Sequence, residues 1–163
     1  MLLQPLYWGL DPLFSTHVKF TLLDIHKLEY REDYDIYFFK GRPLRFTEIV
    51  GVVVGIERKE NFIIYILDDA TATLPCICWH IPHQEMKMNI ELGSLIRVRG
   101  KLGMWKEERQ VSTSNIQEIN DPNEEVLHML EVRRLHEVYS TPFQMSSLVE
   151  AKKTELQAKL SEE

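Results

Sequence analysis

The sequence has little cysteine, no long apolar run and no excess of positive charge. Only Cys76 and Cys78 are cysteines, and one residue apart on an expected strand they are badly placed to bond each other. We expect reduced thiols, as in intracellular proteins. No window approaches the roughly 18 apolar residues of a membrane span, and residues 1–10 lack the basic start and apolar run of a signal peptide. These absences argue against a secreted or membrane-spanning protein.

The net charge of -6 argues against a protein that coats nucleic acid by bulk electrostatics. Binding follows the local field rather than the sum of charges, so a local basic surface stays possible. With 163 residues, 44% of them hydrophobic, the chain can bury one good core. We expect one domain with an appendage.

The sequence also lacks the spacings that catalysis and metal binding require. The nearest approach to a metal site is the group Cys76, Cys78, His80 and His83. Structural zinc sites separate paired cysteines by two to four residues on a turn, whereas these alternate along an expected strand. Asp68 and Asp69 are expected to form a turn, since no phosphate-cradling glycine loop accompanies them. No spacing identifies a nucleophile with its base. We therefore predict a protein that is not an enzyme, with no catalytic residue, metal or cofactor.

Five segments have the alternation or the β-branched content of strands. They cover residues 48–56, 62–68, 74–81, 95–102 and 109–119. Gly51 and Gly55 allow the first strand to bend and serve two sheets. A helix-compatible segment, residues 82–91, separates the third strand from the fourth. This order predicts a mainly β fold, a five-stranded OB-fold barrel with a helix between strands 3 and 4.

The barrel is predicted to span residues 36–120 and to follow an N-terminal extension, residues 1–35, that packs on it. The extension opens with an aromatic strap broken by Gly9 and Pro12. Alternation over residues 17–25 predicts a first strand or a strand-like cover, and the charge of residues 27–35 predicts a surface loop. A short hairpin turning at Gly41 then begins the barrel.

A helix is predicted over residues 121–139. Asp121 is expected as its N-cap, Pro122 at its first helical position and Glu124 in a capping box. The apolar residues of this helix extend over more than one face, and a single barrel can cover only one. We predict that the remainder docks a partner; burial in a second layer of the protein is the alternative. Residues 140–163 are expected to form a polar helical tail or linker.

The expected fourth strand and the connection after it combine cations with an aromatic ring. Arg97, Arg99 and Lys101 share one strand face at intervals of roughly 6.5 to 7 Å, close to the phosphate spacing of an extended single strand. Trp105 and Lys106 follow, and a ring beside a basic row suits single-stranded nucleic acid. The alternative is that these cations only prevent edge pairing of the strand.

Trp79 has two possible positions, because periodicity cannot assign the core side of its strand. If the two cysteines face inward, Trp79 stands on the outer sheet beside Tyr65 and Trp105 as a stacking platform in the OB-fold groove. In the opposite register Trp79 is buried. The candidate nucleic-acid contacts are therefore Tyr65, Trp79, Arg97, Arg99, Lys101, Trp105 and Lys106.

Several stretches carry a family resemblance in their order and spacing. They are YWGLDPLF at residues 7–14, KGRPL at 40–44 with IVGVVVGI at 49–56, LDDATATLPCICW at 67–79, LGSLIRVRGKL at 92–102 and NDPNEEVLHMLEV at 120–132. Together they resemble the N-terminal OB domain of the Stn subunit of the telomere-capping CST complex. That subunit is itself similar to the middle subunit of replication protein A.

The resemblance implies a heterodimer with the small OB-fold Ten subunit, docked through the barrel and its C-terminal helix. It implies Val126, Met129, Leu130 and Arg133 as partner contacts. Other implied partners are single-stranded G-rich telomeric DNA, a large CST subunit and polymerase α-primase, which the family recruits or stimulates for fill-in synthesis. The implied location is the nucleus, at the telomeric region of the chromosome, with no membrane contact.

The resemblance also has departures. Where the family often has a basic residue and a tyrosine, this chain has Gly103 and Trp105. The tryptophan keeps a stacking role, whereas Gly103 removes one cationic contact. Family members usually continue into winged-helix domains, so the chain is expected to be a fragment. The alternative function is a protein-protein interaction module whose barrel groove binds a peptide or partner loop and makes no DNA contact of its own.

Overall fold

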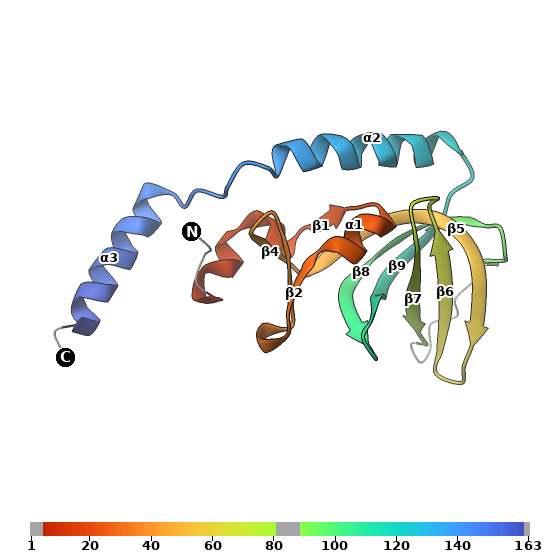
Figure 1. The fold of residues 1–163 in the computed structure, drawn as a ribbon, viewed down its shortest axis with the longest axis horizontal. Helices are drawn as coiled ribbons and strands as arrows, with labels where there is room; N and C mark the ends of the chain where they lie inside the picture. Colours follow the sequence, from red (N-terminus) through yellow and green to blue (C-terminus); the bar gives the residue numbers. More distant parts are fainter. Residues whose placement is uncertain (1–4, 81–88, 162–163) are drawn as a thin grey trace.

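The computed structural model describes residues 5–80 and 89–161 (Figure 1). The strands are β1 His17–Lys19, β2 Glu29–Arg31, β3 Ile36–Phe39, β4 Arg42–Leu44, β5 Phe46–Arg58, β6 Phe62–Asp68, β7 Thr73–Trp79, β8 Leu95–Trp105 and β9 Glu108–Glu118. The helices are α1 Leu22–Lys27, α2 Asn123–Val138 and α3 Ser147–Ser161, with 3-10 helices η1 Pro5–Leu10, η2 Pro12–Ser15 and η3 Glu32–Tyr34. Most of the helix-compatible segment predicted at 82–91 lies outside the described residues.

Strands β5 to β9 close into a barrel. The larger sheet has the order β1-β5-β6-β7-β9-β8, and a further pairing of β5 with β8 completes the ring. β7 runs parallel to β9, while the other neighbouring barrel strands are antiparallel. The predicted mainly β, five-stranded OB-fold barrel is confirmed.

The barrel closes because β5 bends, as its glycines predict. Its first half pairs with β8 and its second half with β6, and the register shifts between Val53 and Gly55. A second irregularity separates Arg99 from Gly100 on β8. A Cβ on Gly100 would overlap the carbonyl of Ser112, so the close approach of β8 and β9 requires glycine there.

The N-terminal extension differs from the prediction. Residues 17–25 do not form one strand: β1 adds parallel to β5, and the chain then turns into α1. Thr21 and Asp24 make a reciprocal capping box, and the buried Asp69 carboxylate accepts a hydrogen bond from the Leu22 N–H at 2.9 Å. These caps bond the first N–H groups of the helix. The alternation of apolar residues, on which the strand prediction rested, does not reveal such caps. Phe20, Leu22 and Ile25 still enter the core.

Residues 27–35 also differ from the predicted loop. They form β2 and η3, and β2 pairs with β3 in a small sheet of order β2-β3-β4. The predicted hairpin is confirmed, with its turn at Lys40 and Gly41, both at positive φ, but it belongs to this small sheet and does not begin the barrel as predicted. The predicted turn after β6 is confirmed too: Asp69 Oδ1 accepts from the Thr71 N–H at 2.9 Å.

The C-terminal part consists of two helices. α2 begins at Asn123, with Pro122 and not the predicted Asp121 as its N-cap residue. The Asp121 carboxylate accepts a hydrogen bond from the Asn123 N–H at 2.9 Å, while the Glu124 side chain pairs with Arg97. α2 runs along one side of the barrel, and α3 lies apart from it (Figure 1). None of the described helices has both the length and the apolar composition to cross a membrane.

Candidate nucleic-acid interface and docking helix

Two exposed tryptophans lie at one end of the barrel. Trp79 ends β7 and Trp105 ends β8, and their exposed fractions are 55% and 65%. The β5–β6 and β8–β9 connections lie at that same end (Figure 1). In OB-folds the second and third strands and these two connections form the ligand face. We name this end, with Phe62, Trp79, Trp105 and Lys106, the aromatic end.

The register of β7 is settled by its cysteines. Cys76 and Cys78 are buried, so Trp79 stands on the outer sheet. It pairs across strands with Phe62, and the two ring centroids lie 4.9 Å apart. Phe62 is a candidate that periodicity missed, because only the β6–β7 register identifies it as Trp79's neighbour. Burial raises the pKa of the Cys76 thiol, which marks it as an inert core side chain.

Tyr65 is a wrong prediction. Its side chain is 3% exposed and lies opposite Cys76 inside the barrel, so it cannot stack on a base. Burial raises its pKa. The cause of the error is that β6 is apolar on both faces: Ile64 and Ile66 alternate outward with Tyr65 inward, and composition does not distinguish the two.

The three cations predicted as a row on β8 are engaged in ion pairs. The three side chains do share the outer face, but Arg97 Nη2 lies 3.0 Å from Glu124 Oε2 and Arg99 Nε lies 2.5 Å from Glu48 Oε2. Lys101 is half exposed, with Asp35 at 3.8 Å. Arg97 therefore links β8 to α2, and Arg99 links β8 to β5.

Glu48 is the centre of these ion pairs. Its side chain is only 5% exposed, and it also lies 3.5 Å from Lys19 Nζ, which in turn contacts Glu131 of α2. Burial raises the Glu48 pKa, but the hydrogen bond from Arg99 and the charges of Lys19, Arg99 and Arg97 together outweigh it, so the net shift is downward. We name Lys19, Glu48, Arg97, Arg99, Glu124 and Glu131 the Glu48 cluster.

α2 buries one face and exposes another. His128 and Val132 pack against the barrel side, and His128 Nε2 donates to the Phe20 carbonyl at 3.2 Å. Val126, Leu127 and Leu130 are 59%, 53% and 62% exposed. This apolar surface has the properties of a docking site.

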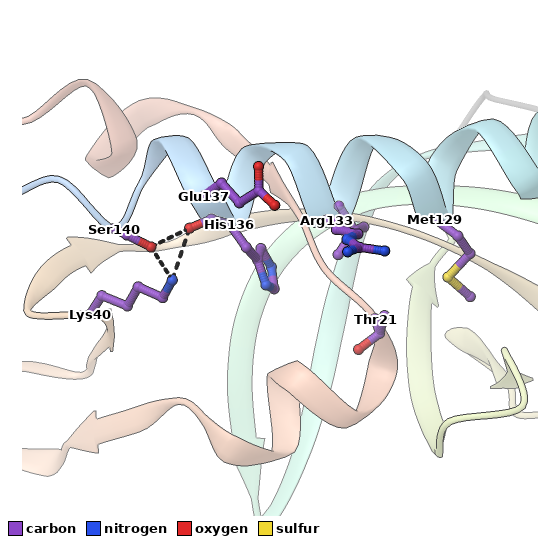
Figure 2. Close-up of a pocket in the computed structure, with 8 residues that line it drawn as sticks. Thr21, Lys40, Met129, Arg133, His136, Glu137 and Ser140 are labelled. Atoms are coloured by element: carbon purple, nitrogen blue, oxygen red, sulfur yellow. Dashed lines mark hydrogen bonds between the residues drawn. The ribbon is translucent and has the colours of Figure 1, made fainter.

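Met129 and Arg133, also predicted as partner contacts, each lie three residues along α2 from a residue of that surface; Met129 is half-buried and Arg133 is exposed. Both line a groove of about 400 Å³ between α2, Thr21 and Lys40. Figure 2 shows their side chains. Lys40 Nζ closes one end by donating to the His136 carbonyl at 2.8 Å and to Ser140 Oγ. The Lys40 ammonium group thus caps the C-terminal end of α2, where a positive charge interacts favourably with the helix dipole.

A family comparison agrees with this geometry. A model of the family described as telomere regulation protein Stn1 matches residues 18–159. The chain belongs to the Stn1 family. This is a family of telomere regulatory OB-fold proteins and not an enzyme family, which confirms that prediction. In the described part of the chain, no three His, Cys, Asp or Glu side chains are grouped to hold a metal.

Curated Stn1 relatives align with most of the chain. CST complex subunit STN1 of Mus musculus is 32% identical, over 91% of this chain and 48% of that protein. The subunit of Homo sapiens is 30% identical, over 88% of this chain and 47% of that protein. The chain therefore spans about half the length of the curated relatives it matches.

Solved structures share the fold. A chain of the S. pombe Stn1–Ten1 complex superposes with a TM-score of 0.69 at 23% identity, covering 77% of this chain and 95% of that one. A chain of a replication protein A heterotrimer bound to ssDNA gives 0.70 at 23% identity, covering 78% and 100%. These likenesses show the OB-fold architecture of the Stn1 barrel.

Proposed function

We propose that this Stn1-family chain is a telomere end-protection subunit that binds single-stranded DNA at the aromatic end. The observation that carries the proposal is the pair of exposed tryptophans at the OB-fold ligand end, with Phe62 beside Trp79. Bases stack on such rings without regard to sequence, and Lys106 supplies a cation for a phosphate. Lys101, half exposed on the same strand face as Trp105, is a second candidate cation.

The second part of the proposal is a heterodimer with a small OB-fold protein on α2. The exposed apolar surface of Val126, Leu127 and Leu130 supports it. A structure of the S. pombe Stn1–Ten1 complex shares this fold, which suggests a Ten1-type partner. G-rich telomeric DNA, the other CST subunit, polymerase α-primase and a nuclear telomeric location complete the proposal for the whole protein, and they rest on family membership.

The test is replacement of each tryptophan by alanine, with fluorescence anisotropy of a labelled G-rich single strand, a scrambled strand and a duplex. Each substitution that removes a stacking ring should weaken the binding free energy by about 1 to 3 kcal/mol. Tyr34→Ala removes an exposed ring on η3, outside the barrel, and is the matched control. Measurements with and without the partner separate the contribution of the second OB-fold.

A second candidate function is a protein interaction module without DNA contact. The outward pairs Ile64–Ile77 and Ile66–Pro75 favour it, because they give β6 and β7 an apolar outer face that offers phosphates nothing. If neither this chain nor its heterodimer binds any strand, this function replaces the first.

A further inference from the structure

The Glu48 cluster is electrically balanced and crosses three neighbouring strands. The register places Lys19 on β1 and Arg99 on β8 directly opposite Glu48 on β5. Three cations, Lys19, Arg97 and Arg99, face three carboxylates, Glu48, Glu124 and Glu131. Of the three carboxylates only Glu48 is buried and contacts all three cations.

Removal of the Glu48 charge would change this surface sharply. Arg99 has its Nε bonded to Glu48 while its side chain is 49% exposed, so its guanidinium is accessible once that bond is lost. Arg97 would keep its ion pair with Glu124, which is partly exposed on α2, and a 3.4 Å hydrogen bond to the Gln117 side chain. The two arginines alternate along β8 at roughly the spacing of phosphates in an extended strand.

We propose that Glu48 is a specificity-determining residue, which neutralises the arginines of β8 and confines single-stranded nucleic acid to the aromatic end. The inference rests on the proposed DNA binding and names a residue that restricts where the strand can lie. A like arrangement of cations without the buried carboxylate would attract the phosphate backbone onto the exposed part of β8 around Arg99. That part of β8 would then offer a competing, purely electrostatic site.

The experiment compares Glu48→Gln with Glu118→Gln in the full chain. Both changes remove one negative charge, but Glu118 is exposed and pairs with Ile96, at the opposite end of the β8–β9 ladder from Trp105. The measurement is anisotropy of a labelled oligothymidylate between about 50 and 200 mM salt. We expect Glu48→Gln to bind about tenfold more tightly at the lower salt. Its log-log salt slope should steepen by about 0.7 for each arginine that contacts a phosphate.

The same pair of variants is measured in a chain that also carries Trp79→Ala and Trp105→Ala. The gain from Glu48→Gln should persist there, because the new site is not the aromatic end. If neither the parent chain nor its heterodimer binds single-stranded DNA, the proposed function fails, yet a gain specific to Glu48→Gln still supports the neutralising role. Equal affinity and slope in Glu48→Gln and Glu118→Gln would overturn the inference.

Thermal unfolding shows first whether Glu48→Gln is folded. If it is not, Arg99→Gln decides, since Lys19 still pairs with Glu48 in that variant. A neutralised Arg99 contributes no phosphate contact, so the strand affinity should stay within about twofold and the salt slope should not change. A weaker affinity with a shallower slope would show that Arg99 already contacts DNA and would refute the role of Glu48.

Discussion

Lys106 and Glu107 form the turn between β8 and β9 in left-handed backbone conformations, with φ of 49° and 66°. Two-residue hairpin turns of this kind favour Asn-Gly, because side chains with a Cβ are strained there. The β3–β4 turn has a positive φ at two positions too, but its second residue is Gly41. The β8–β9 turn therefore carries a lysine beside Trp105 at a cost in stability, as functional sites often do.

We expect Glu107→Gly to raise the free energy of unfolding by about 1 kcal/mol, because glycine adopts this φ without strain. Binding of single-stranded DNA should not weaken, since Lys106 remains. Adding Lys106→Asn should keep the stability but weaken strand binding and lower the salt slope by about 0.7. Chemical denaturation and anisotropy measure the two effects. An unchanged stability of Glu107→Gly would show that the turn is unstrained.

Some site residues follow from the sequence alone and others do not. Trp105 follows from the alternation of β8, in which charged and apolar residues differ clearly. Tyr65 does not follow from β6, whose two faces are both apolar. Arg97 and Arg99 were placed on the correct face, but they form ion pairs with Glu48 and, for Arg97, with Glu124. Glu48 is some fifty residues away in the sequence and adjacent only in the β5–β8 register. Pairing across strands, and not local pattern, decides these cases.

At the scale of elements, the barrel strands were predictable because each has alternating or β-branched residues along its length. α2 was predictable because a helix-start signal precedes it. α1 was not, since Val18, Phe20 and Leu22 alternate through β1 and into the helix. The sequence did hold one signal: Thr21 followed three residues later by Asp24, which is a capping pair. Met129, which the family resemblance implies as a partner contact, is half-buried at the groove beside the exposed apolar surface, and its contact with a partner stays a prediction.

The partner prediction for α2 therefore uses the exposed surface. Leu130→Glu should weaken binding of the small OB-fold partner by about 2 kcal/mol or more, because the leucine is 62% exposed and an acid there must be desolvated in the interface. Glutamate keeps the helix propensity. Leu6→Glu makes the same change at a leucine that is 83% exposed on η1 and should leave the affinity as it was. Calorimetric titration gives both values, and equal effects would rule out α2 as the docking element.

At the scale of the molecule, two buried groups join α2, the barrel and the N-terminal extension. His128 on α2 bonds the carbonyl of Phe20, and Glu48 on β5 bonds the cations of β1 and β8. Burial lowers the pKa of His128 below its ordinary 6.5, with Glu48, Lys19 and Arg97 as the charged groups nearby. The pKa of Glu48 lies below its ordinary 4.5. Both shifts make the assembly of these parts sensitive to acid.

The sign is the same for both groups. Below pH 6.5 His128 becomes protonated in the unfolded chain but stays neutral in the folded protein. The free energy of unfolding therefore decreases as the pH is lowered, by up to about 1.4 kcal/mol per pH unit. Stability from Glu48 is present above pH 4.5 and is lost as the pH falls further, toward its lowered folded-state pKa. His136, whose pKa is also lowered by burial, adds to the first loss. We therefore expect acid to lower the free energy of unfolding in two stages, first below pH 6.5 and then below pH 4.5.

His128→Gln isolates the first stage, because an amide can still donate to the Phe20 carbonyl but does not titrate. Urea denaturation from about pH 7 to about pH 5 should show a shallower decline for this variant than for the parent chain. His17→Gln removes an exposed histidine on β1 and is the control. A parent chain whose stability is flat over this range, or a variant whose slope equals the parent's, would contradict burial of a neutral His128. A shallower slope confined to His128→Gln would show that the contact between α2 and Phe20 links protonation to the stability of the whole chain.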